Sequence, residues 1–209
     1  MAKTKNIGGL QLSGKLGSLV FVTYGDETIV RIAPQKRKAD SWSLKQKQHR
    51  QRFVGAVRHY KAYRATVVTP IWSCVATARQ TAYNMFLKAN MPAFNENGCV
   101  ADPSLLRFSI GDLPLPQNFC AERCSDNPTQ IDIRWDSTHV SQLASPTDQL
   151  MGIYYEPEGA APFALNACRS DGYTTLNLPY SPGSAKISLF LFFRKANLSA
   201  YSPDKHFYL

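Results

Sequence analysis

Acidic residues are scarce in the first half of this chain, and their scarcity divides the sequence in two. Residues 1–100 contain 16 Lys/Arg and 4 Asp/Glu, a formal charge of 16 − 4 = +12. Residues 101–209 contain 8 Lys/Arg and 11 Asp/Glu, or 8 − 11 = −3, and the two sums give the +9 of the whole chain. We therefore expect two units, 1–100 and 101–209, and expect the first to meet something anionic.

Long hydrophobic runs are also lacking. The longest, at 187–193, contains Ser188 and falls short of the roughly 18–20 residues that cross a bilayer. Residues 1–9 carry charge but no apolar centre of the kind a signal peptide has. We expect no membrane partner and a cytoplasmic location, with a virion-like particle as the alternative.

Cysteines are few and scattered. The five are Cys74, Cys99, Cys120, Cys124 and Cys168. Cys120 and Cys124 form a C-x3-C pair, but no second Cys or His pair completes a zinc site, so we expect no metal. Their odd number favours reduced thiols, although the spacing leaves a disulfide between Cys120 and Cys124 open.

Catalytic motifs are absent as well. Residues 9–15 match G-x4-G-K, but Leu16 stands where a phosphate loop needs Ser or Thr, and a strand rather than a helix is expected to follow. No G-x-S-x-G elbow or H-E-x-x-H occurs. His49 and His59 lie ten residues apart and are expected to be surface or interface imidazoles. The sequence predicts neither an enzyme nor a cofactor.

The first half contains a clear hairpin and two helical patterns. Residues 18–24 and 28–33 are rich in β-branched and aromatic side chains, and a turn at 25–27 joins them. A helix is expected from 44 to about 64, capped by Ser41 or Ser43, and a second from about 70 to 90. We expect the two helices to form a hairpin packed against the β-hairpin.

The first expected helix has two distinct stripes. Its apolar stripe contains Phe53, Val57, Tyr60 and Tyr63, at spacings of three and four. A largely cationic stripe follows the same period on another face, through Lys47, Arg50, Val54, Arg58 and Lys61.

The candidate binding residues come from this stripe and the basic segment that precedes it. Three interpretations stay open for them: contacts to nucleic-acid phosphates, an interface with an acidic protein, or a solvated face. The candidate residues are Lys36, Arg37, Lys38, Lys47, Arg50, Arg58, Lys61 and Arg64.

The second half reads as short strands separated by Gly, Pro, Asp and Asn. A further strand is expected earlier, at 105–110. Regular short strands with such turns predict an antiparallel β-sandwich. The expected strands of this half are 119–122, 131–135, 150–155, 163–168, 174–178 and 187–194.

Several segments resemble, in order, an uncharacterised domain-of-unknown-function family that is widespread in Bacteroidota. They are 14–17, 30–34, Gln48 with Arg52-Phe53, 82–86 with Asn90, 109–114, 169–172 and 176–179. The chain departs from the family at 38–41, where an Asn-Pro-x-Thr-like turn is expected. The pattern of Gln, Arg and Phe in the first helix also looks like segments of bacteriophage structural proteins. The second half resembles fibronectin type III or immunoglobulin-like domains, with Trp135 in the core.

The sequence therefore predicts an α+β protein. An N-terminal β-hairpin with two helices precedes an antiparallel β-sandwich of the fibronectin III/Ig-like kind. The expected function is that of a non-enzymatic interaction or assembly protein, a phage-like or mobile-element structural component that binds a protein partner or itself. The alternative is a nucleic-acid-binding protein that uses the basic helix at 44–64.

Overall fold

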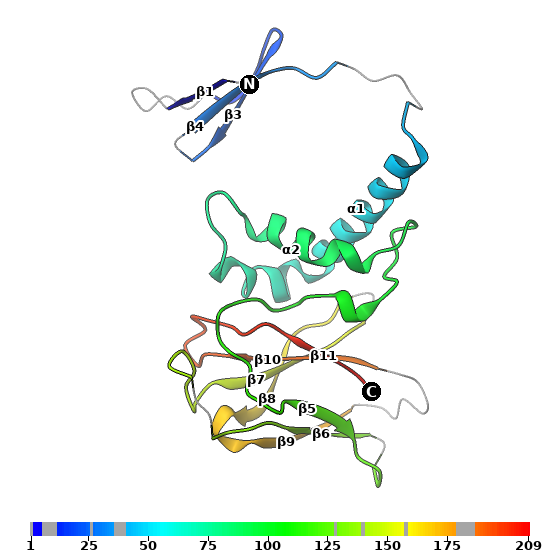
Figure 1. Cartoon of the computed structure of the whole chain (residues 1–209), viewed down its shortest axis with the longest axis vertical. Coiled ribbons are helices and arrows are strands. Elements are labelled where there is room, and N and C mark those ends of the chain that lie inside the picture. The colour runs from blue at the N-terminus through cyan, green and yellow to red at the C-terminus, as the bar shows by residue number, and fades with distance from the viewer. Residues whose placement is uncertain are drawn as a thin grey trace.

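The computed structural model describes residues 2–5, 12–25, 27–35, 41–127, 129–138, 141–156, 159–178 and 187–209. Helices and antiparallel sheets are both present, as expected. Figure 1 shows a helical layer between an N-terminal sheet and two further sheets that contain the C-terminal strands.

The N-terminal sheet contains four antiparallel strands in the order β1-β4-β3-β2: β1 (Ala2–Lys5), β2 (Gly14–Leu16), β3 (Leu19–Tyr24) and β4 (Glu27–Ile32). The expected hairpin is confirmed as β3 and β4, and Gly25 has a φ of 57° in the connection between them. The sheet's edge strands β1 and β2 were not predicted. They are three or four residues long, too short to give a period-two pattern.

The register of this sheet places three apolar side chains in one row. Leu16 lies opposite Leu19, which lies opposite Ile32, and residues directly opposite one another share a face. Lys15 and Arg31 lie in the neighbouring row, on the other face. The three apolar side chains are 72%, 38% and 77% exposed, respectively, so one end of the sheet presents a hydrophobic row.

The first long helix, α1 (Leu44–Tyr63), begins where the sequence allows a cap. The Ser43 side chain accepts a hydrogen bond from the Gln46 amide, and the Gln46 side chain accepts one from the Ser43 amide. This reciprocal pair starts the helix at Ser43 rather than Ser41. The chain then continues as a turn of π-helix, η1 (Arg64–Val68), which places Val67 and Val68 in the core.

The second expected helix is much shorter than predicted. Only a 3-10 turn, η2 (Trp72–Cys74), and α2 (Ala82–Asn90) form within 70–90. The amides of Thr77 and Gln80 each donate to the other residue's carbonyl, and the Thr77 hydroxyl also accepts from the Gln80 amide. These local bonds compete with helix formation, and Thr81 then caps a new helix through its hydroxyl.

The strand expected at 105–110 is wrong. A 3-10 turn, η4 (Pro103–Leu105), is followed by irregular backbone. The Arg107 amide donates to Asn90 Oδ1 at 2.9 Å, and the Phe108 amide donates to Asp204 Oδ2 at 2.7 Å. Buried side chains thus take the donors that a neighbouring strand would otherwise pair.

The C-terminal strands form two antiparallel sheets. One has the order β11-β10-β7-β8 and the other has the order β5-β6-β9. The six expected strands of this half are confirmed to within a residue or two, while β11 was missed. The strands are β5 (Cys120–Arg123), β6 (Gln130–Arg134), β7 (Gln149–Tyr154), β8 (Phe163–Cys168), β9 (Tyr173–Asn177), β10 (Ser188–Arg194) and β11 (Lys205–Tyr208).

Two hydrophobic cores hold the molecule together. One contains residues from both C-terminal sheets, among them Ile133 of β6 and Leu191 of β10, together with Trp135. The other joins the helices to the opposite side of β7 and β10, where Trp72 and Phe86 share a cluster with Phe190. Strand β10 is therefore buried on both faces, and the helical core draws on residues from both sides of residue 100.

The helices that the structure describes include none with the length and apolar character needed to cross a bilayer.

Candidate functional site: the cationic face of α1

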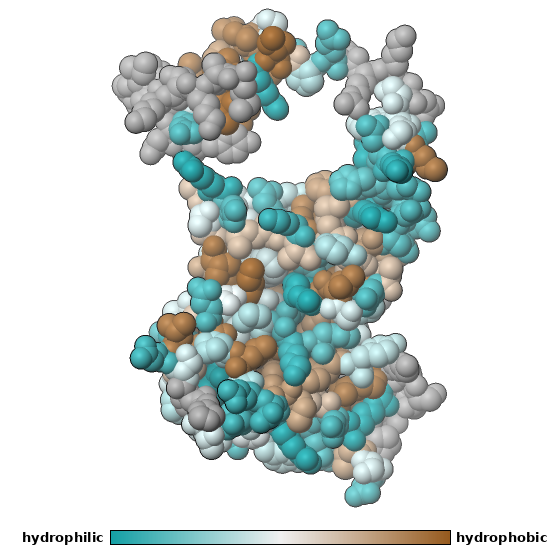
Figure 2. All heavy atoms as spheres, in the orientation of Figure 1, coloured by the Kyte–Doolittle hydropathy of each residue, from teal (hydrophilic) through white to brown (hydrophobic). Residues whose placement is uncertain are grey.

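The cationic stripe predicted from the sequence lies on the solvent side of α1. Lys47, Arg50, Val54, Arg58 and Lys61 are all exposed and follow one another at intervals of three and four. In Figure 2 the surface over α1 is mainly hydrophilic. We call these five residues the cationic face.

The other candidate cations divide into two groups. Arg64 is exposed and begins the π-helical turn, one residue after α1 ends. Lys36, Arg37 and Lys38 lie outside the described residues. Five of the eight candidates are therefore placed on one continuous helical segment.

One cation is held in place by an aromatic ring. The Arg50 guanidinium lies 4.4 Å from the centroid of the Trp42 ring, just before the helix. Phe53 is 42% exposed and lies three residues after Arg50, at the edge of the cationic face. The sequence placed Phe53 in the buried stripe, and the structure corrects this: the buried side uses Ala56, His59 and Tyr63.

The buried side of α1 is aromatic and contains a histidine. His59 is only 6% exposed, and its ring centroid lies 4.7 Å from that of Tyr63 and 5.7 Å from that of Phe86. The expectation of a surface or interface imidazole was wrong, because His59 lies on the same buried side of α1 as the core residues Ala56 and Tyr63. Burial lowers the pKa of His59 to about 4, so the ring is neutral at pH 7. His59 therefore adds no charge to the cationic face.

Two glycines fix α1 against the chain that follows α2. A Cβ on Gly55 would lie 2.3 Å from the carbonyl oxygen of Gly98, and one on Gly98 would lie 2.7 Å from that of Gln51. Gly98 has a φ of 76°, a conformation that favours glycine. The Gln48 side chain also donates to the Glu96 carboxylate in the same loop. These contacts hold the cationic face in a fixed direction.

A cavity of about 680 Å³ lies beside the cationic face. Gly55, Arg58 and Ala62 contribute from α1, and Phe94, Val100 and Tyr155 contribute from the other side. Arg58 thus belongs to both the face and the cavity. Periodicity identified Arg58 as a surface cation, but the cavity depends on loop residues up to 97 positions away (155 − 58 = 97) and had no sequence signal.

The described residues form no metal-ligating cluster, and they place Lys15 in a strand. Among them, no group of three or more His, Cys, Asp or Glu side chains is placed to hold a metal ion. Gly14 and Lys15 form part of strand β2 instead of the loop before a helix, so the G-x4-G-K sequence lacks the phosphate-loop context.

The chain matches no protein-family model, and no curated protein is significantly similar to it.

Proposed function

We propose that this chain is a non-enzymatic interaction and assembly protein that docks an acidic protein surface on the cationic face of α1. The observation that carries the proposal is the arrangement of that helix: its cations are exposed on one side while its other side is fixed in an aromatic core. A rigid row of like charge raises the association rate with a surface of opposite charge. The cavity beside Arg58 provides room for an apolar anchor side chain from the same partner.

A second surface supports assembly rather than a single contact. The exposed row of Leu16, Leu19 and Ile32 lies on a different sheet from both hydrophobic cores. In Figure 2 hydrophobic residues are visible at one end of the N-terminal sheet. Exposed apolar groups that gather in one place mark interaction surfaces more often than isolated ones do. The proposal includes a phage-like or mobile-element role, which rests on the helix sequence pattern alone.

The proposal extends to the fold of the second half. We propose that its two sheets form a sandwich of the fibronectin III/Ig-like kind. Support comes from the shared core, in which Trp135 packs against Phe119 and Phe193 at centroid distances of 6.3 and 5.6 Å. Membership of the Bacteroidota family belongs to the same proposal and is supported by the ordered sequence motifs.

A photo-crosslinking experiment tests the docking face directly. Val54 lies in the middle of the cationic face and is exposed, so benzoylphenylalanine at this position would touch a docked partner. The matched control carries the same group at Lys88, which is exposed on α2. We expect protein adducts from position 54, including adducts to acidic surfaces or a second copy, and few from position 88. Equal yields from the two positions would count against this face.

Charge reversal provides the matched functional test. Lys47→Glu with Lys61→Glu changes the net charge by −4, and so does Arg79→Glu with Lys88→Glu, away from the face. The first pair should abolish the position-54 adducts and the second pair should leave them. If both pairs of substitutions reduce the position-54 adducts equally, the partner responds to the net charge of the protein, and the cationic face is not its docking site.

Nucleic-acid binding is the second candidate, and exposed Phe53 at the edge of the cationic face favours it because a base can stack on such a ring. Phosphate contacts release counterions, so affinity for a 20-mer of DNA or RNA should fall steeply between 50 and 200 mM salt. If neither nucleic acid binds at low salt while protein adducts form at position 54, the nucleic-acid candidate is lost.

A further inference from the structure

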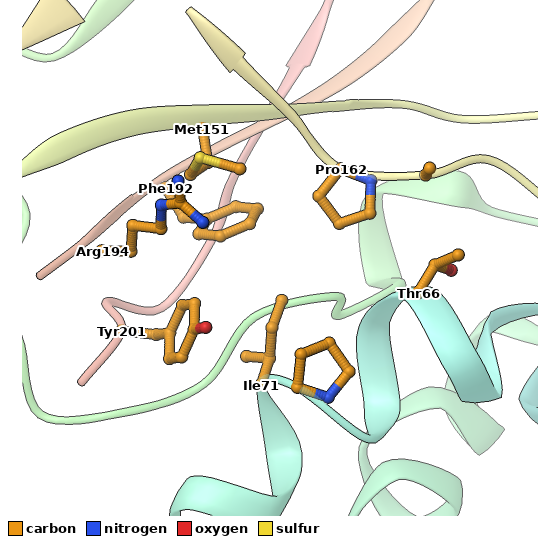
Figure 3. Close-up of a pocket in the computed structure, with 9 residues that line it drawn as sticks. Thr66, Ile71, Met151, Pro162, Phe192, Arg194 and Tyr201 are labelled. Atoms are coloured by element: carbon orange, nitrogen blue, oxygen red, sulfur yellow. The ribbon is translucent and has the colours of Figure 1, made fainter. Parts of the chain in front are cut away.

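A second pocket lies between the helical layer and the sheet that contains β7 and β10, separate from the cationic face. Its volume is about 260 Å³. Figure 3 shows Ile71 and Thr66 from the helical side facing Phe192, Met151 and Pro162 from the strand side. The pocket therefore lies at the junction of the two halves of the chain.

The walls of this pocket are rigid and apolar. Ile71, Met151 and Phe192 are all buried and belong to the core that joins the helices to β7 and β10. Because these side chains are packed on their other sides, the pocket is preformed and loses little conformational freedom when a ligand enters. Such walls favour a compact apolar group.

One polar atom that lines the pocket, the Tyr201 hydroxyl, has no hydrogen-bond partner among the described residues. Tyr201 is 5% exposed, and Figure 3 shows its hydroxyl directed into the pocket. None of the hydrogen bonds found among the described residues uses this hydroxyl. The Tyr201 backbone is fixed, because its carbonyl accepts from the Leu113 amide at 3.2 Å and it forms a bridge with Arg194. Burial raises the pKa of Tyr201, so the hydroxyl keeps its proton and acts as a donor.

The pocket also contains a cation. The Arg194 guanidinium donates through Nε and Nη2 to Gln149 Oε1, at 3.1 and 2.9 Å. Gln149 is neutral, and among the described residues no carboxylate lies within ion-pair distance of Arg194. The Arg194 charge therefore has no carboxylate partner among the described residues. Arg194 and Tyr201 line the same pocket, and the Arg194 charge acts on the pKa of Tyr201 in the lowering direction.

We propose that this pocket binds a small monocarboxylate whose compact apolar body packs against Ile71, Met151 and Phe192. The carboxylate accepts a hydrogen bond from the Tyr201 hydroxyl and pairs with the Arg194 guanidinium. A charge-assisted bond of this kind is the strongest contact that the two donors can make. This binding site is independent of the docking face on α1.

Benzoate is a suitable probe because it combines a carboxylate with a compact ring. Benzyl alcohol and benzylamine have a similar body without the negative charge. We expect benzoate to shift the methyl NMR signals of Ile71 and Met151 in a saturable way, and to bind about tenfold or more tightly than either control, as expected for a hydrogen bond to a charged group. Absence of saturable shifts with benzoate, or equal affinity for benzyl alcohol, would overturn the proposal.

Substitutions in the pocket test whether benzoate binds there. Tyr201→Phe removes only the hydroxyl and should weaken benzoate binding about tenfold, while the control Tyr173→Phe, on β9, should leave the affinity unchanged. Ala161→Trp fills the pocket from its exposed rim and should abolish binding with the core intact. Should Tyr201→Phe prove unfolded, Ala161→Trp decides alone, since a folded Ala161→Trp protein that still binds benzoate contradicts the site.

Discussion

The guanidinium of Arg169 and the carboxylate of Asp148 form a buried ion pair, with Nε donating to Oδ2 at 3.2 Å. Arg169 also donates from Nη2 to the Pro114 carbonyl and lies 4.5 Å from the centroid of the Phe193 ring. Asp148 Oδ2 accepts in addition from the Ser145 amide. The pair therefore joins the β7 and β8 ends to the segment before β5.

Removing one partner of this pair should be costly. Arg169→Met leaves the Asp148 charge buried without compensation, which typically costs about 3–5 kcal/mol of unfolding free energy. Urea unfolding of the variant measures this loss. Arg134→Met is the control, because Arg134 is exposed and pairs with Asp132 only at 3.9 Å, so it should lose less than about 1 kcal/mol. Similar losses for the two variants would contradict a special role of the buried pair.

Gly55→Ala should destabilise the protein, although alanine is the better helix former by about 0.5–1 kcal/mol. The added methyl would meet the Gly98 carbonyl oxygen at 2.3 Å, so α1 and the loop must separate. We expect a loss of about 1–3 kcal/mol, the usual range for overpacking. Thermal or urea unfolding measures it, and a stability gain would show that the loop does not fix the helix.

Stability should depend on pH through two buried groups of opposite effect. His59 has a pKa of about 4 in the folded protein and 6.5 when exposed, so its contribution is lost as pH falls from 6.5 to 4. Asp204 has a pKa of about 6 in the folded protein and 3.8 when exposed, because burial disfavours its charged form. Its contribution to stability is therefore lost as pH rises from 3.8 to 6. Each group contributes about 3 kcal/mol to the free energy of unfolding, since one pKa unit corresponds to about 1.4 kcal/mol. Between pH 4 and 6 the two contributions change in opposite directions.

Single variants should separate the two effects. His59→Phe keeps a ring in the aromatic cluster without titrating, and its stability relative to the parent should improve as pH falls from 6.5 to 4. Asp204→Asn should show the reverse, with its relative stability improving as pH rises from 3.8 to 6. Urea unfolding at pH 4, 5, 6 and 7 measures how the free energy of unfolding of each variant changes with pH. Parallel curves for parent and variants would refute the assignment.

All five cysteines should be reduced after aerobic purification. Cys120 begins β5 and Cys124 follows its end, so four extended residues separate their Cα atoms by about 13 Å, well beyond the roughly 7 Å limit of a disulfide. Thiol titration of the denatured chain should give five thiols, with exposed Cys74 and Cys99 the first to react in the native protein. A peptide crosslinked through Cys120 and Cys124 would contradict this.

Local chemistry explains what the sequence predicted well. Gly25 marks the turn of the hairpin, and Ser43 with Gln46 marks the start of α1. The cationic stripe was placed correctly because it depends only on helical period. The helix around residue 75 was wrong because periodicity does not report the competing bonds of Thr77 and Gln80.

Distant contacts account for what the sequence did not predict. His59 is buried by aromatic residues as far along the chain as Tyr155, and the segment around Phe108 is held by Asp204, 96 residues later (204 − 108 = 96). The pocket of Tyr201 likewise takes its walls from both halves. No local pattern encodes such pairings. The division into units at residue 100 stays a prediction.

The core shared by the helices and β10 can be completed only after β10 has been synthesised. Phe86 is synthesised 104 residues before Phe190 (190 − 86 = 104), its partner in the same core. At about 5–20 residues per second, the helices wait about 5–20 s for the strand that buries them. Until then Phe108 lacks the contact with Phe190 that closes the core, and a chain released before β10 would carry the cationic helix without the sheet that completes this core.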